Sequence, residues 1–250
     1  MVNPAVLVTG GARRIGAAIS KGFADAGWHV VIHYGQSARE AEELAASLPS
    51  AQTVSSDLSN PTESVLMVER LAESLDDWRM LINCAGTFQF DDAIALDPAV
   101  FEEAMQVNAG VPTRMSQVFL HSARARGSKR VVQVTDQKIA NLNPDFFSYT
   151  MSKHALTATV RMLAMAQTDP GTRVYGLAPG AILASHDQSE AETERSHRMN
   201  PLRRKTGPDE MAQAALFLAE GWLASGETLF IDSGQHLVPQ PRDVLFLARQ

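Results

Sequence analysis

Cysteine is nearly absent from the chain, which holds one, Cys84, among 250 residues. A single cysteine excludes an intrachain disulfide and a cysteine-rich metal site, and it favours a reducing compartment. The seven histidines are scattered along the sequence without the spacing of zinc ligands. We therefore predict no metal site.

Positive charge is also scarce, since Lys and Arg total 22 against 28 Asp and Glu, a formal net charge of -6. This balance offers no basic surface to a polyanion, so we expect no nucleic-acid partner. The longest uncharged apolar stretch, residues 174–184, is too short for a membrane span and is broken by Pro179 and Gly180. No basic residue precedes the first apolar run, unlike in a signal peptide. We expect a cytoplasmic protein without membrane contact.

What the chain does have is 45% hydrophobic residues, enough to bury one large core. Short β-type runs alternate with longer segments of helical period, which predicts a parallel sheet covered by helices on both faces. Ser37, with Glu40 three residues later, predicts a capping box at one helix start. The expected strands are residues 5–9, 28–34, 52–55, 79–83, 130–135, 173–178 and 228–231; the expected helices are 12–26, 37–47, one opened by Pro61, 97–124, 148–167 and 208–219.

A glycine-rich turn, residues 9–16, joins the first strand to the first helix. Glycines at this junction let a diphosphate approach the backbone, and the helix N-terminus supplies free N–H groups and partial positive charge. The alternative is a tight turn that serves helix packing alone. A strict G-x-G-x-x-G pattern is absent, so the turn by itself indicates a dinucleotide site only moderately.

The residues around this turn indicate NADPH rather than NADH. An NAD-preferring fold usually places a carboxylate after the second strand, but here that position reads His33, Tyr34, Gly35, Gln36, Ser37. Arg13 and Arg14 instead bring two guanidinium groups that can pair with a phosphate. Cations are unfavourable at a helix N-terminus without an anion nearby, which weakens the alternative that both are merely solvated.

Tyr149 and Lys153 stand four residues apart on a predicted helix and therefore share a face. A nearby ammonium lowers the pKa of a phenol and makes it a usable proton donor, so we expect Lys153 to act on Tyr149 in this way. The pair follows the fifth strand, near the carboxyl edge where open α/β sheets bind ligands.

With these motifs the sequence resembles the short-chain dehydrogenase/reductase family over nearly its whole length. The matching pieces, in order, are residues 9–16, 57–58, 83–86, 107–108, the Tyr149/Lys153 pair, 179–180 and 231–234. The resemblance implies a doubly wound α/β Rossmann fold of about seven parallel strands, with Asn108 supporting a proton path through a helix irregularity. It implies cofactor contacts at Gly10, Arg13, Arg14, Ile15, Gly16, His33, Tyr34, Ser37, Asp57, Leu58, Asn83, Ala85, Gly86, Thr135, Pro179 and Gly180.

Two departures from the family pattern are similar to its pteridine reductase branch, which includes dihydromonapterin reductases. Arg14 stands in place of the middle glycine of the first motif, and Asp136 in place of the active-site serine. His33 and Tyr34, followed by Ser37, and the aromatic Phe88 also resemble that branch. Among bacterial members, residues 178–183 followed by His186 and Asp187 look similar. The resemblance implies NADPH-dependent reduction of a dihydropterin or dihydrofolate.

The exchange of serine for Asp136 fits reduction of a ring C=N bond, which needs a proton delivered to nitrogen. Burial against a bound ring should raise the pKa of Asp136 while Lys153 pulls it down. We expect Asp136, Tyr149 and Lys153 to titrate as a coupled set. The alternative is that Asp136 caps a turn and the protein is a non-catalytic NADP-binding scaffold. A carbonyl reductase of the same family is the other alternative.

Phe88 is the candidate to stack on a flat heterocycle, with Phe90, Phe146 and Phe147 as competitors for that wall. We thus expect substrate contacts at Arg14, Phe88, Asp136 and Tyr149, and a substrate loop near residues 183–205.

Residues 1–238 would form the single domain and residues 239–250 a tail. The apolar run 244–247 in that tail indicates packing at a subunit interface. The helix at 148–167 carries more apolar surface than one sheet needs. We therefore expect a homotetramer.

Overall fold

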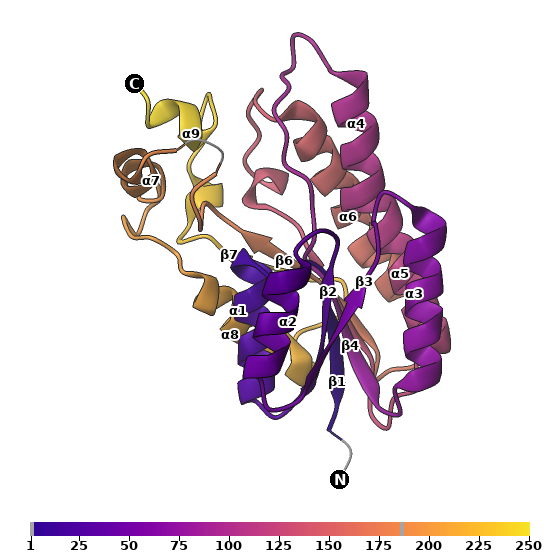
Figure 1. Ribbon diagram of the computed structural model, residues 1–250. Helices are drawn as coiled ribbons and strands as arrows, with labels where there is room; N and C mark the ends of the chain where they lie inside the picture. Colours follow the sequence, from indigo (N-terminus) through magenta and orange to yellow (C-terminus); the bar gives the residue numbers. More distant parts are fainter. Residues whose placement is uncertain (1–2, 186–187) are drawn as a thin grey trace.

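The computed structural model describes residues 3–185 and 188–250, and within them seven parallel strands form one sheet. The strand order is β3-β2-β1-β4-β5-β6-β7, so the order reverses between β1 and β4 (Figure 1). This topology confirms the predicted doubly wound Rossmann fold. The strands are β1 (Ala5–Val8), β2 (His29–Tyr34), β3 (Ala51–Ser55), β4 (Trp78–Asn83), β5 (Arg130–Val134), β6 (Arg173–Pro179) and β7 (Thr228–Ile231).

Helices cover both faces of the sheet and divide the core into two layers (Figure 1). On one face lie α1 (Arg14–Asp25), α2 (Ala38–Ser47) and α8 (Pro208–Glu220). On the other lie α3 (Pro61–Ser74), α5 (Val111–Ser122) and α6 (Phe147–Met165). The central strands are apolar on both sides because both sides are covered, and all four residues of β1 are buried.

Three helix starts follow their sequence signals, and a fourth does not. Pro61, Pro98 and Pro208 each occupy the first turn of their helix, in α3, α4 (Pro98–Met105) and α8. The capping box predicted at Ser37 is wrong, because its side chain makes no capping hydrogen bond. Its φ of -93° and ψ of 53° lie outside the extended region from which an N-cap side chain reaches the first-turn N–H groups.

The long helix expected over residues 97–124 is interrupted. A π-helical turn, Gln106–Gly110, separates α4 from α5 and contains Asn108. Single π turns of this kind occur often at functional sites. The helix irregularity that the family resemblance implies at Asn108 is therefore present.

The C-terminal tail folds back onto its own chain. Its short helix α9 (Val244–Leu247) buries Val244 and Leu245, and the ring of Phe246 packs edge-on against Phe90. α9 lies beside α7 (Glu190–Ser196), above the carboxyl edge of the sheet (Figure 1). The apolar segment thus finds cover without a second subunit, and its packing at a subunit interface stays a prediction.

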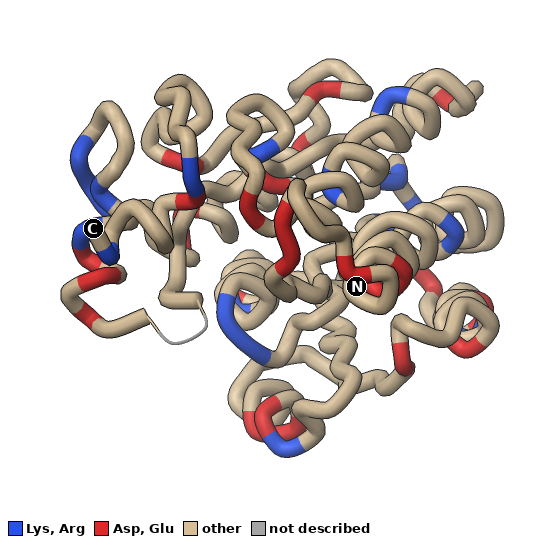
Figure 2. The backbone as a smooth tube through the Cα atoms, turned by 90° about the horizontal axis from the view of Figure 1, so that it is seen from above, with Lys and Arg blue, Asp and Glu red and all other residues tan. Residues whose placement is uncertain are grey.

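The surface carries mixed charge, with acidic and basic residues interspersed along the backbone rather than gathered on one face (Figure 2). Met162 and Met165 on α6 are 68% and 87% exposed, and the homotetramer expected from this helix stays a prediction. No helix of the described residues has the length and apolar character needed to cross a membrane.

Candidate active site

Two adjoining hollows lie at the carboxyl edge of the sheet. They share Arg14, Ile15, Phe88, Tyr149 and Pro179, so molecules bound in the two hollows would meet at these residues. The first, here the glycine groove, is lined by Gly10, Arg13, Arg14, Ile15, Gly16, Cys84, Ala85, Gly86, Thr87, Phe88, Val134, Thr135, Tyr149, Lys153 and Pro179. The second, here the acid pocket, has a volume of about 200 Å³. It is lined by Arg14, Ile15, Phe88, Asp136, Gln137, Lys138, Tyr149, Pro179, Gly180, Ala181, Ile182, Leu183, Ser185, Gln188, Ser196, His197, Gln235, Asp243, Val244 and Leu245.

The glycine turn is held in a shape that keeps side chains out of the groove floor. Gly10 has a φ of +61°, and a Cβ on Gly16 would overlap the carbonyl oxygen of Gly10. Thr9 Oγ1 accepts hydrogen bonds from the N–H groups of Cys84 at 2.9 Å and Ala85 at 3.0 Å, which joins the end of β1 to that of β4. The backbone is therefore open to close approach by a diphosphate.

His33 supports this turn from below instead of lining it. Its Nδ1 accepts from the N–H of Gly10 at 3.2 Å, so its Nε2 carries the proton and donates to the carbonyl oxygen of Ser56 at 3.1 Å. Burial lowers its pKa from 6.5 to about 4, so the ring is neutral. The ring of His33 is 1% exposed and lies beneath the glycine turn, so its predicted cofactor contact stays a prediction.

Arg14 occupies the position where the family has a glycine, and its φ is +53°. This left-handed region suits glycine and costs about 1–2 kcal/mol for another residue. The guanidinium crosses the pocket mouth and donates to the carbonyl oxygens of Ala184 at 3.0 Å and Leu183 at 3.4 Å. Arg14 thus links α1 to the segment after β6, while the side chain of Arg13 is exposed at the groove.

Asp136 and Tyr149 form the centre of the acid pocket. The phenol of Tyr149 donates to Oδ2 of Asp136 at 2.7 Å, and the N–H of Lys138 donates to Oδ1 at 2.9 Å. Asp136 therefore caps a turn, as the alternative supposed, and still offers its other oxygen to Tyr149. Burial raises the pKa of Asp136, as predicted, while its hydrogen bonds and the charges of Lys138 and Lys153 oppose that rise.

Lys153 does not set the direction of the Tyr149 pKa in this arrangement, and its predicted lowering of that pKa stays a prediction. Burial, followed by the carboxylate of Asp136, raises the pKa of Tyr149 well above its ordinary value. Lys153 Nζ lies 5.6 Å from the centre of the Tyr149 ring and donates to the carbonyl oxygen of Val134 at 2.8 Å. Its charge opposes the raised pKa of Asp136, and burial lowers its own pKa.

Asn108 joins the loop after β4 to α6 from within the π turn. Its Oδ1 accepts from the N–H of Thr87 at 2.8 Å, and its Nδ2 donates to Ser152 Oγ at 3.0 Å. Ser152 precedes Lys153, so Asn108 positions the lysine-bearing turn of α6. Its part in a proton path stays a prediction.

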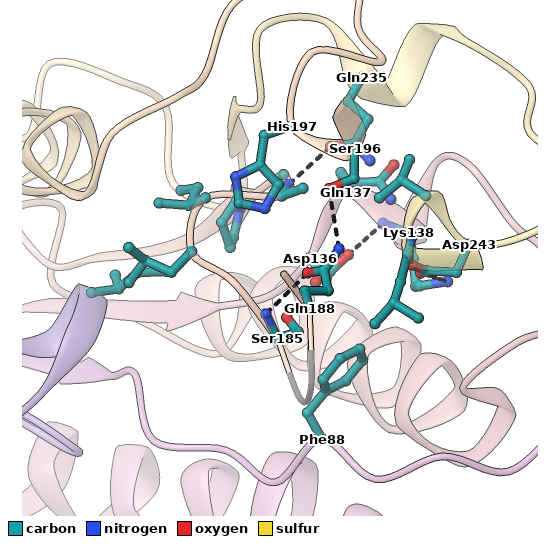
Figure 3. Close-up of a pocket in the computed structure, with 18 of the residues that line it drawn as sticks. Phe88, Asp136, Gln137, Lys138, Ser185, Gln188, Ser196, His197, Gln235 and Asp243 are labelled. Atoms are coloured by element: carbon teal, nitrogen blue, oxygen red, sulfur yellow. Dashed lines mark hydrogen bonds and ion pairs between the residues drawn. The ribbon is translucent and has the colours of Figure 1, made fainter. Parts of the chain in front are cut away.

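Phe88 is the phenylalanine of the four candidates that lines both hollows. It stacks on Phe146 with ring centres 4.1 Å apart and meets the ring of Tyr149 edge-on at 4.6 Å. Phe146 is 1% exposed and lies behind it, while Phe90 packs edge-on against Phe146. The Phe88 side chain points into the acid pocket from the side opposite His197 (Figure 3).

Several predicted cofactor residues lie outside both hollows. Asn83 is 2% exposed and directs its amide away from the groove, donating to Gln133 Oε1 at 2.9 Å and Ser116 Oγ at 3.0 Å. This bonding fixes the end of β4, while Asn83 Oδ1 is buried and has no hydrogen-bond partner among the described residues, so its cofactor contact stays a prediction. Leu58 is buried in the core, and Asp57 is exposed after β3. Tyr34 is the last residue of β2 and Ser37 follows the strand; both are half-buried, and their cofactor contacts stay predictions.

Part of the far wall of the acid pocket comes from the predicted substrate loop 183–205, which contributes Ser185, Gln188, Ser196 and His197 (Figure 3). His186 and Asp187 of that loop lie outside the described residues. The rest of this wall carries no sequence motif, because the fold brings its residues to Asp136 from separate loops. These further residues are Gln137, Lys138, Gln235, Asp243, Val244 and Leu245.

The glycine groove fits a dinucleotide. Thr135 Oγ1 is buried at the groove and has no hydrogen-bond partner among the residues that the structure describes, so it is available to a bound amide or hydroxyl group. Gly180, which follows Pro179 and lines the acid pocket, admits no side chain, since a Cβ would lie 2.7 Å from Gln235 Oε1. Among the described residues, no cluster of His, Cys, Asp or Glu could hold a metal ion.

The switch-point groove, with Tyr149 and Lys153 beside it, defines an oxidoreductase of the dinucleotide-binding Rossmann class. A family model described as "Enoyl-(Acyl carrier protein) reductase" matches residues 10–236. The chain therefore belongs to the short-chain dehydrogenase/reductase family.

Known proteins similar to this chain include reductases of two kinds. FolM alternative dihydrofolate reductase 1 from Brucella canis, complexed with NADP, has 34% identity, 97% coverage of each chain and a TM-score of 0.89. Its counterpart from Brucella suis, in complex with NADP, has 35% identity over 96% of this chain and 98% of that one, with a TM-score of 0.89. Granaticin polyketide synthase putative ketoacyl reductase 2 from Streptomyces violaceoruber is 31% identical over 94% of this chain and 97% of its own.

Proposed function

We propose that the protein reduces a dihydropterin, of the dihydromonapterin, dihydrobiopterin or dihydrofolate type, to the tetrahydropterin with NADPH. The observation that carries this proposal is the hydrogen-bonded pair of Asp136 and Tyr149 in the acid pocket. A buried carboxyl group with a raised pKa is a proton source, and a ring C=N bond needs a proton at nitrogen. The similarity to two alternative dihydrofolate reductases complexed with NADP supports both the substrate class and the cofactor.

The residues of the glycine groove would hold NADPH, which supplies the hydride to the carbon of the C=N bond. The N–H groups at the start of α1, with Arg13 and Arg14, would bind the phosphates. Lys153 would hold the nicotinamide ribose, and Thr135 Oγ1 would find a partner on the ligand. These contacts orient the cofactor toward the acid pocket, where the two hollows meet.

The pterin ring would lie against Phe88 and present its C=N nitrogen to the acid pair. A stacked aromatic contact contributes about 0.5–1.5 kcal/mol beyond the burial of area. The 2.7 Å contact connects the phenol of Tyr149 to Asp136, so when the carboxyl group is protonated, its proton can pass to the Tyr149 oxygen as the phenol gives its own proton to the substrate nitrogen, which leaves Asp136 as the carboxylate. Arg14, at the junction of the hollows, would contact both cofactor and substrate.

A ketone reductase is the second candidate, supported by the similarity to a putative ketoacyl reductase. Asp136 argues against it, since a carboxylate at this position repels the oxyanion that develops when a carbonyl is reduced, unless the carboxyl group is protonated. A serine hydroxyl at this position would instead donate a hydrogen bond to that oxygen.

The test is NADPH oxidation measured with a dihydropterin, dihydrofolate and a panel of ketones, for the wild type and Asp136→Ser. We expect wild-type turnover on the dihydropterin and a loss of about 100-fold or more in the variant. Its NADPH affinity, measured by fluorescence titration, should stay within about twofold. Glu43→Gln, on the exposed face of α2, is the matched control. Wild-type turnover on ketones alone would overturn the proposal, as would NADPH binding with no turnover at all.

A further inference from the structure

The segment Arg242–Leu247, here the C-terminal strap, forms one wall of the acid pocket from within the same chain. Asp243, Val244 and Leu245 line the pocket together with Asp136 and Tyr149. Val244 is 7% exposed and Leu245 is 4% exposed, so both residues are packed against the rest of the protein. The strap and the acid pair therefore face the same bound molecule.

Two ion pairs hold the strap to the loop after β5. Lys138 Nζ lies 2.8 Å from Oδ2 of Asp243, and their side chains are 3% and 12% exposed. Arg242 Nε donates to both carboxylate oxygens of Asp145 at 2.8 and 2.9 Å, and the N–H of Asp243 donates to Asp145 Oδ2 at 2.7 Å. Lys138 also donates to Asn143 Oδ1 at 2.8 Å. The Lys138–Asp243 pair is the more buried of the two, since the Arg242 side chain is 44% exposed, and removing one charge of such a pair leaves the other at a cost.

Lys138 contacts both sides of this arrangement. Its backbone N–H holds Oδ1 of Asp136 at 2.9 Å, while its ammonium holds Asp243 of the strap. We propose that Lys138 and Asp243 are positioning residues for the acid pair: they dock the strap as a pocket wall and balance the charge beside Asp136. The effect of these residues on dihydropterin reduction rests on the proposed function. Their effect on the charge of Asp136 rests on the contacts alone.

The two charges act on the acid pair in opposite directions. The ammonium of Lys138 favours the ionised form of Asp136, and the carboxylate of Asp243 disfavours the ionised form of Tyr149. Losing one member of the ion pair leaves the other uncompensated next to the acid. The other charged or titratable groups around Asp136 are Tyr149 and Lys153 on α6, and Arg14 and His197 across the pocket.

The experiment compares the basic limb of the pH profile of kcat for dihydropterin reduction in four proteins. Asp243→Asn leaves the positive charge of Lys138 uncompensated, so Asp136 loses its proton at a lower pH and the basic limb should move to lower pH. Lys138→Met leaves Asp243 uncompensated and should move the limb to higher pH. Each shift should be on the order of one pH unit. The double variant should return the limb toward that of the wild type.

The expected result is two opposite shifts that cancel in the double variant. Loosening of the strap alone would instead move the basic limb of all three variants in one direction. Shifts of the same sign, or no shift, would overturn the proposal. Lys138→Arg, which keeps the charge, should retain the wild-type limb, and Glu43→Gln again serves as the surface control.

A second measurement needs no substrate and separates this proposal from the proposed function. The carboxyl ¹³C resonance of Asp136, assigned by its loss in Asp136→Asn, is titrated in the same proteins. Its midpoint should fall in Asp243→Asn and rise in Lys138→Met. If the wild type fails to reduce dihydropterins and these midpoints still move apart, the proposed function fails and the role of Lys138 and Asp243 stands. Unmoved midpoints would refute that role whatever the substrate.

Discussion

Tyr149, in the first turn of α6, donates a 2.7 Å hydrogen bond to Asp136, which follows β5. The bond makes the phenol and the carboxyl group one proton-holding unit, since each changes the proton affinity of the other. An Asp at this position therefore does more than replace a hydroxyl: it supplies a second exchangeable proton beside the first.

Asp136→Asn should make the protein more stable and less active. The pKa of Asp136 is raised in the folded protein, so its contribution to stability is present below the unfolded pKa and is lost as pH rises through the folded value. Urea unfolding should show a larger free energy of unfolding for the variant at pH 8, with a smaller gain at pH 5. A gain that does not depend on pH would contradict this origin.

His33 should make the protein sensitive to acid. Its folded pKa of about 4 lies below the unfolded 6.5, so its stabilising effect is complete above pH 6.5 and is lost as pH falls toward 4. At about 1.4 kcal/mol per pKa unit, the loss is about 3 kcal/mol. His33→Asn should flatten the dependence of unfolding free energy on pH in this window. The exposed His121→Asn should leave that dependence as it is.

Arg14→Gly and Arg14→Ala should separate the effect of the strained backbone on stability from the effect of the guanidinium on NADPH binding. Both variants lose the guanidinium, so both should bind NADPH about tenfold more weakly. Only glycine relaxes the left-handed backbone, so Arg14→Gly should be more stable than Arg14→Ala by about 1 kcal/mol. Thermal unfolding and fluorescence titration measure the two effects, and equal stability of the two variants would show that the turn rearranges.

Thr135→Val should stabilise the protein without NADPH and weaken its binding. The hydroxyl of Thr135 is buried and has no hydrogen-bond partner in the described part of the chain, so its removal should raise the free energy of unfolding by about 1 kcal/mol. Loss of its bond to the ligand should weaken NADPH affinity about threefold to tenfold. Thr113→Val is the control, since Thr113 Oγ1 already donates to the carbonyl oxygen of Ala109 at 2.7 Å and its loss should not stabilise.

The sheet and the proline-opened helices could be predicted because their signals are local. β1 is an unbroken apolar run, and Pro61 and Pro98 each follow a residue, Asn60 or Asp97, whose side chain caps the helix. The glycine turn and the Tyr149/Lys153 pair were likewise readable from spacing. These features depend on neighbours within one turn of helix or one strand.

The rest depends on contacts between residues far apart in the sequence. Lys138 pairs with Asp243 only when the strap folds back onto the loop after β5, and no local sequence pattern near either residue predicts this contact. The raised pKa of Tyr149 needs the depth at which the carboxylate of Asp136 and the phenol are buried, which spacing does not express. The sequence around His33 does not show that its ring lies beneath Gly10, because this contact forms only when β2 lies against β1.

The left-handed backbone at Arg14 concentrates strain in one residue of the turn. A φ of +53° is one that glycine adopts freely, so the cost of about 1–2 kcal/mol comes from the side chain and not from the length of the turn. The guanidinium at the junction of the two hollows is thus obtained by one strained residue, with no change in the number of residues between β1 and α1.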